Sequence, residues 1–324
     1  MCENALIHTL SLDPCYNLAL EDTLFDTHKR GVTLYLWRNQ NTVVIGRNQN
    51  AWKECRLSAL SQDGGTLVRR MSGGGAVFHD TGNLNFTFIT TKALYDQTRQ
   101  LGVIIEAVRA LGIPAGFTGR NDIVTADGAK FSGNAFRHSR TTDLHHGTLL
   151  IDVDMQKLSK YLAPSPEKLR SKGVDSVRAR VRNLSELNPE LTTAMMAQAL
   201  REAFLREYGS FSVLEEKDID QSLLAEATAK HQSWAWRCGA SPAFDAELST
   251  RFPWGGVELC LSLEKGRIVQ ARAYSDAMDE AFIRALSPAL LGATYESVAI
   301  ANAVRRLGND MAADIANWLE GLAL

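Results

Sequence analysis

The sequence lacks the features that mark several large classes of protein. No apolar run approaches the ~20 residues of a membrane-spanning helix, and the N-terminus carries neither a secretory signal nor a transit pattern. The cysteines are scattered, form no CxxC pair and are odd in number, which argues against a disulfide framework or a zinc site. They are Cys2, Cys15, Cys55, Cys238 and Cys260. We therefore expect a cytoplasmic protein with reduced thiols and no contact with a membrane.

Net charge is also nearly absent. Lys and Arg total 35 against 37 Asp and Glu, a formal charge of −2, so no overall basic field draws the chain onto nucleic acid. What the chain does have is length and apolar content: 324 residues, 45% of them hydrophobic. These values predict a globular protein of about two domains.

Helical and strand-like patterns are interleaved along the chain. Asp13-Pro14 begins a capped helix, residues 97–111 and 192–208 repeat apolar side chains at helical spacing, and residues 155–162 form a shorter helix. Strands are expected at 32–37, 42–46, 66–70, 76–79, 83–90 and 149–153. Because the strands are mostly joined by hairpins, we predict an α+β fold with a mixed, mostly antiparallel sheet and packed helices.

A second, smaller unit follows a stretch rich in Gly, Ser and Pro at 238–244. Strands at 257–264 and 267–276 form a hairpin over Lys265-Gly266, and helical segments continue to the C-terminus. We predict a catalytic domain over 1–245 and a small α+β accessory domain over 246–324.

The densest candidate for chemistry is the segment from Arg69 to Asp80, which holds three consecutive glycines, Gly73, Gly74 and Gly75. Glycines let backbone N–H groups approach a ligand closely, and the arginines before them can pair with a phosphate or carboxylate. The alternative is a flexible hairpin loop with solvated arginines. The segment is neither GxxxxGK[ST] nor GxGxxG.

A second candidate is the hairpin that carries Asp122, Lys130 and Ser132. A two-residue Asp-Gly turn pairs Ile123 with Ser132 and places Lys130 and Ser132 on one face. Strict alternation sends Asp122 to the opposite face, so a site shared with Lys130 requires a bulge or the end of the strand. The alternative for Lys130 is a surface lysine whose stem covers apolar neighbours.

Two further features are weaker. His145 and His146 precede a strand, and with His79 they lack zinc-ligand spacing, so hydrogen bonding or packing is favoured over a metal site. Basic residues 168–182 form the one local basic run, either a solvated surface or a cationic flap over a nucleotide. No cysteine adjoins the glycine-rich segment, and Cys55 is typical of a small buried side chain.

Taken in order, the motifs WRNQNTVVIGRNQN, RRMSGGGAVFHDTGNLNFTF, GRNDI, DGAKFSGNAFR, HHGTLL, KGVDSVRARVRNL and WGGVEL closely resemble the lipoate–protein ligases of the bacterial two-domain type. The resemblance runs from about residue 11 to the C-terminus. It implies a catalytic domain like that of biotin ligases and a small C-terminal domain. It also implies a salvage reaction in which lipoate and Mg-ATP give lipoyl-AMP and pyrophosphate, after which the lipoyl group passes to a lysine of an acceptor domain.

The resemblance also implies roles for individual residues. Lys130 would contact the acyl-phosphate oxygens as the catalytic cation, and Asp122 would lie at Mg²⁺. Lipoate and ATP would be bound by Arg70, Ser72, Gly73, Gly74, Gly75, Val77, His79, Asn83, Ser132, Arg137, His146 and Thr148, and by Lys172 and Arg180 in an adenylate-binding loop over 168–183. Met71 departs from the family pattern, where a polar or small residue is expected.

The implied partners are the lipoyl-accepting domains of oxo-acid dehydrogenase E2 subunits and the glycine cleavage H protein, with no nucleic acid. Two alternatives remain. One is an ATP-independent octanoyl or lipoyl transferase of the same fold, which requires a cysteine nucleophile. The other is a non-catalytic module that binds acyl carriers.

Overall fold

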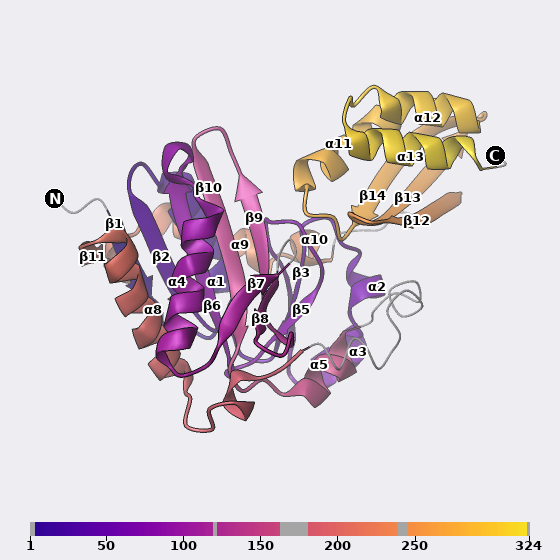
Figure 1. The fold of residues 1–324 in the computed structure, drawn as a ribbon. Coiled ribbons are helices and arrows are strands. Elements are labelled where there is room, and N and C mark those ends of the chain that lie inside the picture. The colour runs from indigo at the N-terminus through magenta and orange to yellow at the C-terminus, as the bar shows by residue number, and fades with distance from the viewer. Residues whose placement is uncertain (1–3, 119–121, 163–180, 239–244, 323–324) are drawn as a thin grey trace. The chain divides into compact units, whose positions relative to one another are not determined.

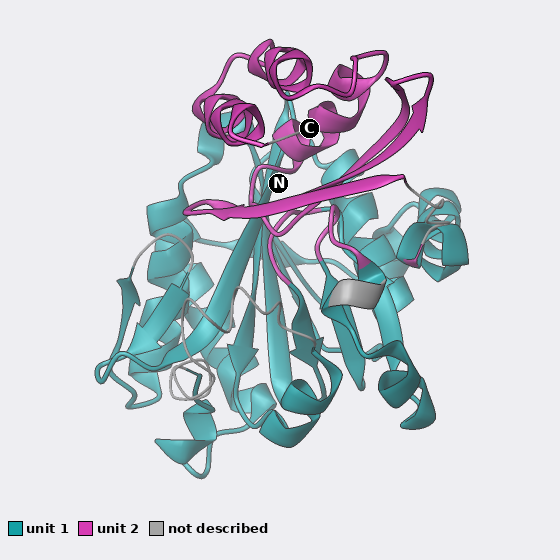
Figure 2. Cartoon of the chain, turned by 90° about the vertical axis from the view of Figure 1, so that its right-hand side faces the viewer, with its two compact units in different colours: residues 1–45, 51–71, 76–237 teal, residues 46–50, 72–75, 238–324 magenta. Residues whose placement is uncertain are grey.

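A computed structural model describes residues 4–118, 122–162, 181–238 and 245–322. The chain separates into two compact units (Figure 2). Unit 1 comprises residues 1–45, 51–71 and 76–237, and unit 2 comprises 46–50, 72–75 and 238–324. The short segment that contains the three glycines therefore groups with the C-terminal residues. We describe the two units separately.

Unit 1 is built on an eight-stranded sheet in the order β11-β1-β2-β6-β10-β9-β8-β7 (Figure 1). Only β1–β2 and β1–β11 pair in parallel, and the other neighbours are antiparallel. The strands are β1 (Asn4–His8), β2 (Val32–Trp37), β6 (Asn83–Thr91), β7 (Ala115–Thr118), β8 (Asp122–Thr125), β9 (Lys130–His138), β10 (Thr142–Leu150) and β11 (Phe211–Val213). The predicted mixed, mostly antiparallel α+β fold is confirmed.

Helices cover both faces of this sheet. On one face, apolar side chains of α4 (Gln97–Ala110) and α8 (Thr193–Tyr208) pack against Leu84, Phe86 and Phe88 of β6. On the other, α1 (Pro14–Thr27) and α9 (Gln221–Gln232) pack against Tyr35, Trp37 and other residues. The shorter helices of unit 1 are α2 (Ala51–Glu54), α3 (Leu57–Gln62), α5 (Met155–Tyr161) and α10 (Trp234–Arg237), with 3-10 turns at Lys92–Leu94, Leu184–Glu186 and Glu216–Asp218.

The predicted cap of the first helix is confirmed. The side chain of Asp13 accepts hydrogen bonds from the amides of Cys15 and Tyr16, and Pro14 occupies the first helical turn, where its missing N–H costs nothing. Gly31, with φ 74°, then turns the chain into β2. A charged pair, Glu21-Asp22, lies inside this helix and is almost wholly buried.

A second sheet in unit 1 rules out the alternative of a hairpin loop around the glycines. Its order is β4 (Thr66–Arg69), β3 (Thr42–Ile45), β5 (Val77–His79). β4 runs parallel to β3 and β5 runs antiparallel to it. The glycine-rich segment therefore crosses from one edge of this sheet to the other and does not close a hairpin. The arginines before it are also not solvated, since Arg69 and Arg70 are only 8% and 6% exposed.

The hairpin between β8 and β9 differs from the prediction by one residue. The Thr125 amide donates to the Ala129 carbonyl at 2.9 Å, so the turn has three residues and ends with Gly128 at φ 83°. Lys130 consequently pairs with Val124 instead of Thr125, and a bulge at Phe131 restores the predicted pair of Ile123 with Ser132. Lys130 and Ser132 do not share a face, which makes that prediction wrong.

In unit 2, three antiparallel strands, β12 (Ala246–Phe252), β13 (Gly255–Glu264) and β14 (Arg267–Ser275), form a sheet. The predicted hairpin over Lys265-Gly266 is confirmed, and both residues have the positive φ of a type I′ turn. Helices α11 (Glu280–Leu290), α12 (Ser297–Arg305) and α13 (Asp310–Glu320) supply its core with apolar residues of β13. Within the described ranges of the whole chain, no helix has the length and apolar content to cross a membrane.

The three-residue turn predicts that a substitution at Gly128 lowers the stability of the fold. Gly128→Ala places a Cβ at a left-handed backbone position, which costs roughly 1–2 kcal/mol, so the urea unfolding midpoint falls. Gly116→Ala in neighbouring β7 is the control, because an added Cβ there meets no atom within 4 Å and the backbone does not have a left-handed φ. Equal effects of the two substitutions would contradict the assigned turn.

Candidate functional site

A row of side chains crosses five strands of the large sheet on the α1 side. Trp37 pairs with Asn85, and Asn85 pairs with Thr148. Thr148 lies opposite Gly133, whose amide donates to Thr148 Oγ1 at 3.3 Å, and Gly133 pairs with Asp122. We call these five residues the cross-strand row. Neighbouring strands lie about 4.8 Å apart, so the four intervals between five strands give the row a length of roughly 19 Å.

Lys130 stands at one end of this row. Its Nζ lies 2.7 Å from Asp122 Oδ1, and a Cβ built on Gly133 would come within 3.3 Å of Nζ. The ammonium thus occupies the space that the glycine leaves. Because Lys130 pairs with Val124, and Val124 alternates with Asp122, both charged groups lie on the same face. The bulge required for a shared site is therefore present.

The last residues of the predicted adenylate-binding loop lie beside Lys130. Val181 forms a parallel bridge with Lys130, and the Arg182 amide donates to the Lys130 carbonyl at 2.9 Å. Arg182 also forms an ion pair with Asp127 in the β8–β9 turn. Lys172 and Arg180 lie outside the described residues, as does most of the predicted 168–183 loop.

Next to the row, a buried carboxylate connects three strands through polar side chains. Trp37 Nε1 donates to Thr87 Oγ1 at 3.0 Å, and the Thr87 hydroxyl donates to Glu21 Oε1 at 2.6 Å. His146 Nδ1 lies 2.8 Å from the same oxygen. Glu21 is 2% exposed, so these partners are what stabilise its charge away from water.

Several polar atoms in this region are buried without a hydrogen-bond partner. Asn83 Nδ2 donates to Asn85 Oδ1 at 2.8 Å, whereas Asn83 Oδ1 and Asn85 Nδ2 have no partner among the described residues. An unsatisfied buried amide costs free energy, and a bound polar ligand is one way to remove that cost.

His79 presents a further donor. Asn39 Oδ1 accepts from Asn17 Nδ2 at 3.0 Å, which leaves the Asn39 amide to donate to His79 Nδ1 at 3.2 Å. The proton of the neutral ring is thereby assigned to Nε2, which has no partner in the described chain. Burial first, then the charge of Arg70 and His146, lowers the pKa of His79 to about 3.

Arg70 is buried beside Val77 in the small sheet. Its Nη1 donates to the carbonyl of Val44 at 3.3 Å, and Val77 pairs with Val44. Burial lowers the pKa of Arg70 to about 10, and the opposite charge of Glu21 offsets part of that decrease. The group therefore stays cationic at neutral pH. Arg69, in contrast, donates to the carbonyls of Trp236 and Arg237.

Two more of the predicted residues, Ser132 and Arg137, lie outside the cross-strand row. Ser132 pairs with Ile123, which lies in the core under α4, so its side chain points to the opposite face of the sheet from Lys130. Arg137 is on the α1 side but is held by Asp22 at 3.1 Å and Asp26 at 3.4 Å, with its guanidinium 3.9 Å from the centre of the Phe25 ring.

The two histidines that are adjacent in sequence lie on opposite faces of the sheet. His146 is on the α1 side, whereas His145 lies on the α4 side with Gln100 and Asn134 at 2.9 and 2.8 Å. Among the described residues, the one group with metal-binding geometry is Glu247, Glu258 and Cys260 in unit 2.

The glycine-rich segment is used largely for packing within unit 2. The Gly74 amide donates to the Ala277 carbonyl at 3.1 Å, and a Cβ on Gly73 would lie 2.7 Å from the carbonyl oxygens of Ala277 and Met278. Ser72 is buried and its carbonyl accepts from the Arg47 amide. Gly75 has no atom within 4 Å of a built Cβ, so it has room for a ligand.

The sequence reasoning missed Glu21, Asn39 and Asp22. Asp22 binds His231 at 3.0 Å and Lys230 at 3.1 Å. Although burial opposes it, the contact with His231 and the charges of Lys230 and Arg137 hold the pKa of Asp22 below its usual value. Acidic residues inside an otherwise apolar helical stretch were a usable signal, since buried carboxylates require partners. Asn39 had no such signal, because its role depends on tertiary contacts.

The assigned state of His79 makes a pH prediction. An unfolded imidazole binds a proton near pH 6.5, whereas the folded His79 binds one only near pH 3. The unfolded state therefore takes up a proton first, and the free energy of unfolding decreases as pH falls from about 6.5 towards 3. In ¹⁵N spectra of the histidine rings, His79 should stay neutral and Nε2-protonated from pH 8 to 5. Titration near pH 6.5, or an Nδ1-protonated ring, would contradict the network.

Comparison with known proteins identifies the family. Residues 13–205 match the model of the lipoyl protein ligase A/B catalytic domain, and residues 241–319 match the bacterial lipoate protein ligase C-terminus. The crystal structure of LipL1 of P. falciparum in complex with lipoate is 27% identical, with a TM-score of 0.86 over 98% of this chain and 99% of that one.

Two shorter structures are also similar. A structure from an archaeal lipoylation system, described as a bipartite lipoate protein ligase and its E2 lipoyl domain from Thermoplasma acidophilum, is 26% identical with a TM-score of 0.65, covering 76% of this chain and all of that one. A lipoate-protein ligase A bound with ATP is 26% identical with a TM-score of 0.61, covering 74% and 99%. The chain therefore belongs to the lipoate–protein ligases of the lipoyl protein ligase A/B family.

Proposed function

We propose that this protein is an ATP-dependent lipoate–protein ligase that forms lipoyl-AMP and pyrophosphate and then transfers the lipoyl group to a lysine. The observation that carries the proposal is the Lys130 ammonium, fixed beside Asp122 and Gly133 at one end of the cross-strand row. Similar structures with lipoate or ATP bound support it. The sequence-derived site residues otherwise remain predictions.

Formation of lipoyl-AMP requires positive charge close to the α-phosphate of ATP. When the lipoate carboxylate attacks the α-phosphate, negative charge grows on the phosphoryl oxygens and on the leaving pyrophosphate. A preorganised ammonium such as Lys130, with N–H donors from Asn85 and His79, stabilises that charge without having to reorient. Arg70 adds a buried cation to the same side of the protein. No covalent intermediate with the enzyme is needed.

Asp122 fits a role at Mg²⁺. One of its oxygens binds Lys130, the other has no partner among the described residues, and its side chain is 45% exposed. Mg²⁺ characteristically binds one or two carboxylates and completes its shell with substrate phosphates and water. Bound there with ATP, the ion would neutralise phosphate charge, while Asp122 would fix its position relative to Lys130.

The apolar tail of lipoate requires a dry surface. Trp37 is 3% exposed, stacks on Tyr35 with ring centres 5.8 Å apart and meets His79 edge-on at 6.1 Å. With Val77, which packs in the same cluster, it forms an apolar surface at the end of the cross-strand row farthest from Lys130, which suits a ligand with an apolar tail and a carboxylate.

For the second step, the partners we propose are lipoyl domains of oxo-acid dehydrogenase E2 subunits and the glycine cleavage H protein. The similar Thermoplasma acidophilum ligase, described together with its E2 lipoyl domain, supports the first of these. The attacking lysine amine displaces AMP from the acyl group, so the cations that stabilised adenylate formation also stabilise the departing phosphate. We expect the reaction to occur in the cytoplasm.

The cysteine-dependent transferase is less well supported. Of the four described cysteines, Cys15 and Cys55 are buried in unit 1. Burial, reinforced by Asp13, raises the pKa of Cys15 to about 11, and a thiol that stays protonated is a poor nucleophile. Cys238 and Cys260 belong to unit 2.

One assay separates the candidate functions. The protein is mixed with an acceptor lipoyl domain, lipoate, Mg²⁺ and ATP, and the acceptor mass is measured. A lipoyl mass gain that needs ATP supports the ligase. A gain from a preformed acyl donor without ATP, through a thioester on the enzyme, would establish the transferase, and no gain under either condition would leave a binding module.

Removing the Lys130 ammonium should abolish most adenylate formation. We expect Lys130→Ala to lower lipoate-dependent exchange of pyrophosphate into ATP by about 10²–10³-fold, with the fold retained because the side chain is partly exposed. Lys157→Ala, a change at an exposed lysine of α5, is the matched control and should exchange at the wild-type rate. Wild-type exchange by Lys130→Ala would remove Lys130 from the mechanism.

A further inference from the structure

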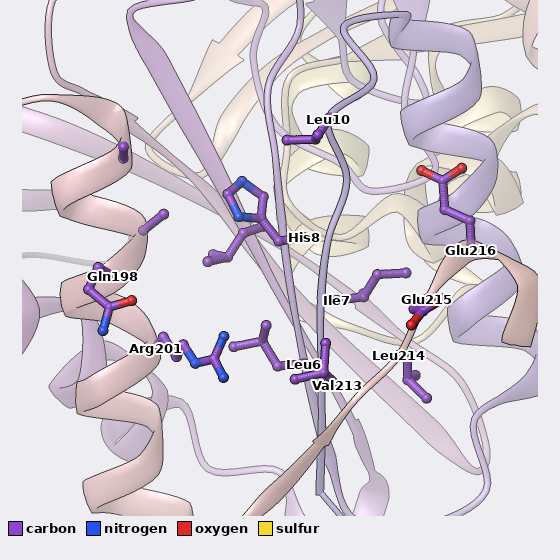
Figure 3. A pocket seen from close by; sticks show the side chains of 13 residues that line it. Leu6, Ile7, His8, Leu10, Gln198, Arg201, Val213, Leu214, Glu215 and Glu216 are labelled. Atoms are coloured by element: carbon purple, nitrogen blue, oxygen red, sulfur yellow. The ribbon is translucent and has the colours of Figure 1, made fainter.

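A cavity of about 500 Å³ lies at the edge of the large sheet, away from the cross-strand row (Figure 3). On the sheet, Leu6 pairs with Val213 of β11 and His8 pairs with Leu36 of β2. Pairing and alternation put all four side chains on the α8 face of the sheet. Leu6 and Leu36 are buried and form the floor, whereas Val213 is 53% exposed at the rim.

The opposite wall explains why the space is open. Ala194, Ala197 and Arg201 lie three or four residues apart on α8 and share the face that lines the cavity. One turn farther along, Leu200 and Phe204 fill the core. Ala194 and Ala197 present only methyl groups to the sheet, and a groove remains between helix and sheet.

One arginine and two glutamates line the groove. In the described part of the chain Arg201 makes no hydrogen bond or ion pair, and its one contact of note is the Phe211 ring at 5.4 Å. Figure 3 shows its guanidinium directed toward Leu6 and Val213. The acids of the lining already have partners, since Glu215 pairs with Lys217 and Glu216 accepts from Thr9.

His8 completes the polar rim. Burial first, and then the positive charge of Arg38, lowers its pKa, so the ring is neutral at pH 7 and adds no second cation. It offers a hydrogen bond instead. The groove therefore combines an apolar floor, one cation that no described residue pairs with, and one neutral polar ring.

We propose that this groove is a second ligand site, which binds a monocarboxylate with an apolar chain of medium length. The carboxylate pairs with Arg201 and the chain lies over Leu6, Leu36 and Ala197. The volume is within the range of small-molecule sites, a single cation matches a single negative charge, and a nucleotide would need several. The site does not depend on the proposed ligase activity.

The test uses decanoate as the probe. A decanoate analogue with a photoreactive diazirine in its chain is irradiated with the full-length protein, and labelled peptides are identified by mass spectrometry. We expect labels in residues 4–10, 193–201 or 211–216, competed by decanoate. Labels confined to peptides that contain Val77 would report the proposed lipoate site alone and would overturn the groove without affecting the proposed function.

Variants assign the contacts. Arg201→Gln should raise the decanoate Kd and reduce the groove label about tenfold, as expected for loss of a charge-assisted bond. Ala194→Phe should fill the groove and reduce the label similarly. Arg140→Gln, the same charge change at another exposed arginine, and Met195→Phe on the exposed side of α8 are the controls.

Lys130→Ala should retain the groove label, which separates this site from catalysis. Unchanged labelling in both Arg201→Gln and Ala194→Phe would overturn the proposal. So would absence of any groove label together with slower transfer to the acceptor domain in Arg201→Gln, because that pair of results would make the groove a protein-binding surface.

Discussion

The hydrogen-bonded register of five neighbouring strands decides which side chains meet on the α1 side of the large sheet. Trp37, Asn85, Thr148, Gly133 and Asp122 form one row because each pair is in register with the next. A slip of one residue in any strand would turn its side chains to the opposite face. The short turn and the bulge in the β8–β9 hairpin are therefore part of the site, since together they bring Lys130 beside Asp122.

The same face also has to hold a buried charge. Glu21 is satisfied by the Thr87 hydroxyl and by His146, and it counters part of the desolvation of Arg70. Removing one partner from such a group leaves a buried charge uncompensated, which is far more destabilising than losing a surface ion pair. The polar residues around Glu21 are consequently tied to stability, and the Thr87 hydroxyl that binds Glu21 also accepts from Trp37 Nε1 and so fixes the position of that indole.

Sequence periodicity predicted the fold class and most elements, because alternation in residues 83–90 and helical spacing in residues 97–111 are local properties. Periodicity did not predict the features that depend on contacts between residues distant in sequence. The number of residues in the turn at Gly128, the bulge at Phe131 and the face of Ser132 depend on how two strands pair.

The glycines illustrate the same limit. Triple glycine indicated a close approach of backbone, and the structure shows that Gly73 and Gly74 use it within unit 2, against residues 277–278, which are remote in sequence. Motifs carried over as a set predicted the family correctly, whereas the role of each residue in them depends on geometry that no single motif contains.

The central claim is that the α1 side of the sheet, from Trp37 to Asp122, binds the reacting end of the ligand. The most direct measurement is a crystal structure of the protein with a non-hydrolysable lipoyl-adenylate analogue. We expect Lys130 Nζ at about 2.7–3.1 Å from an acyl-phosphate oxygen, with the apolar tail against Trp37. An analogue bound on the Ser132 side of the sheet, or with its phosphate out of hydrogen-bond reach of Lys130, would contradict the account.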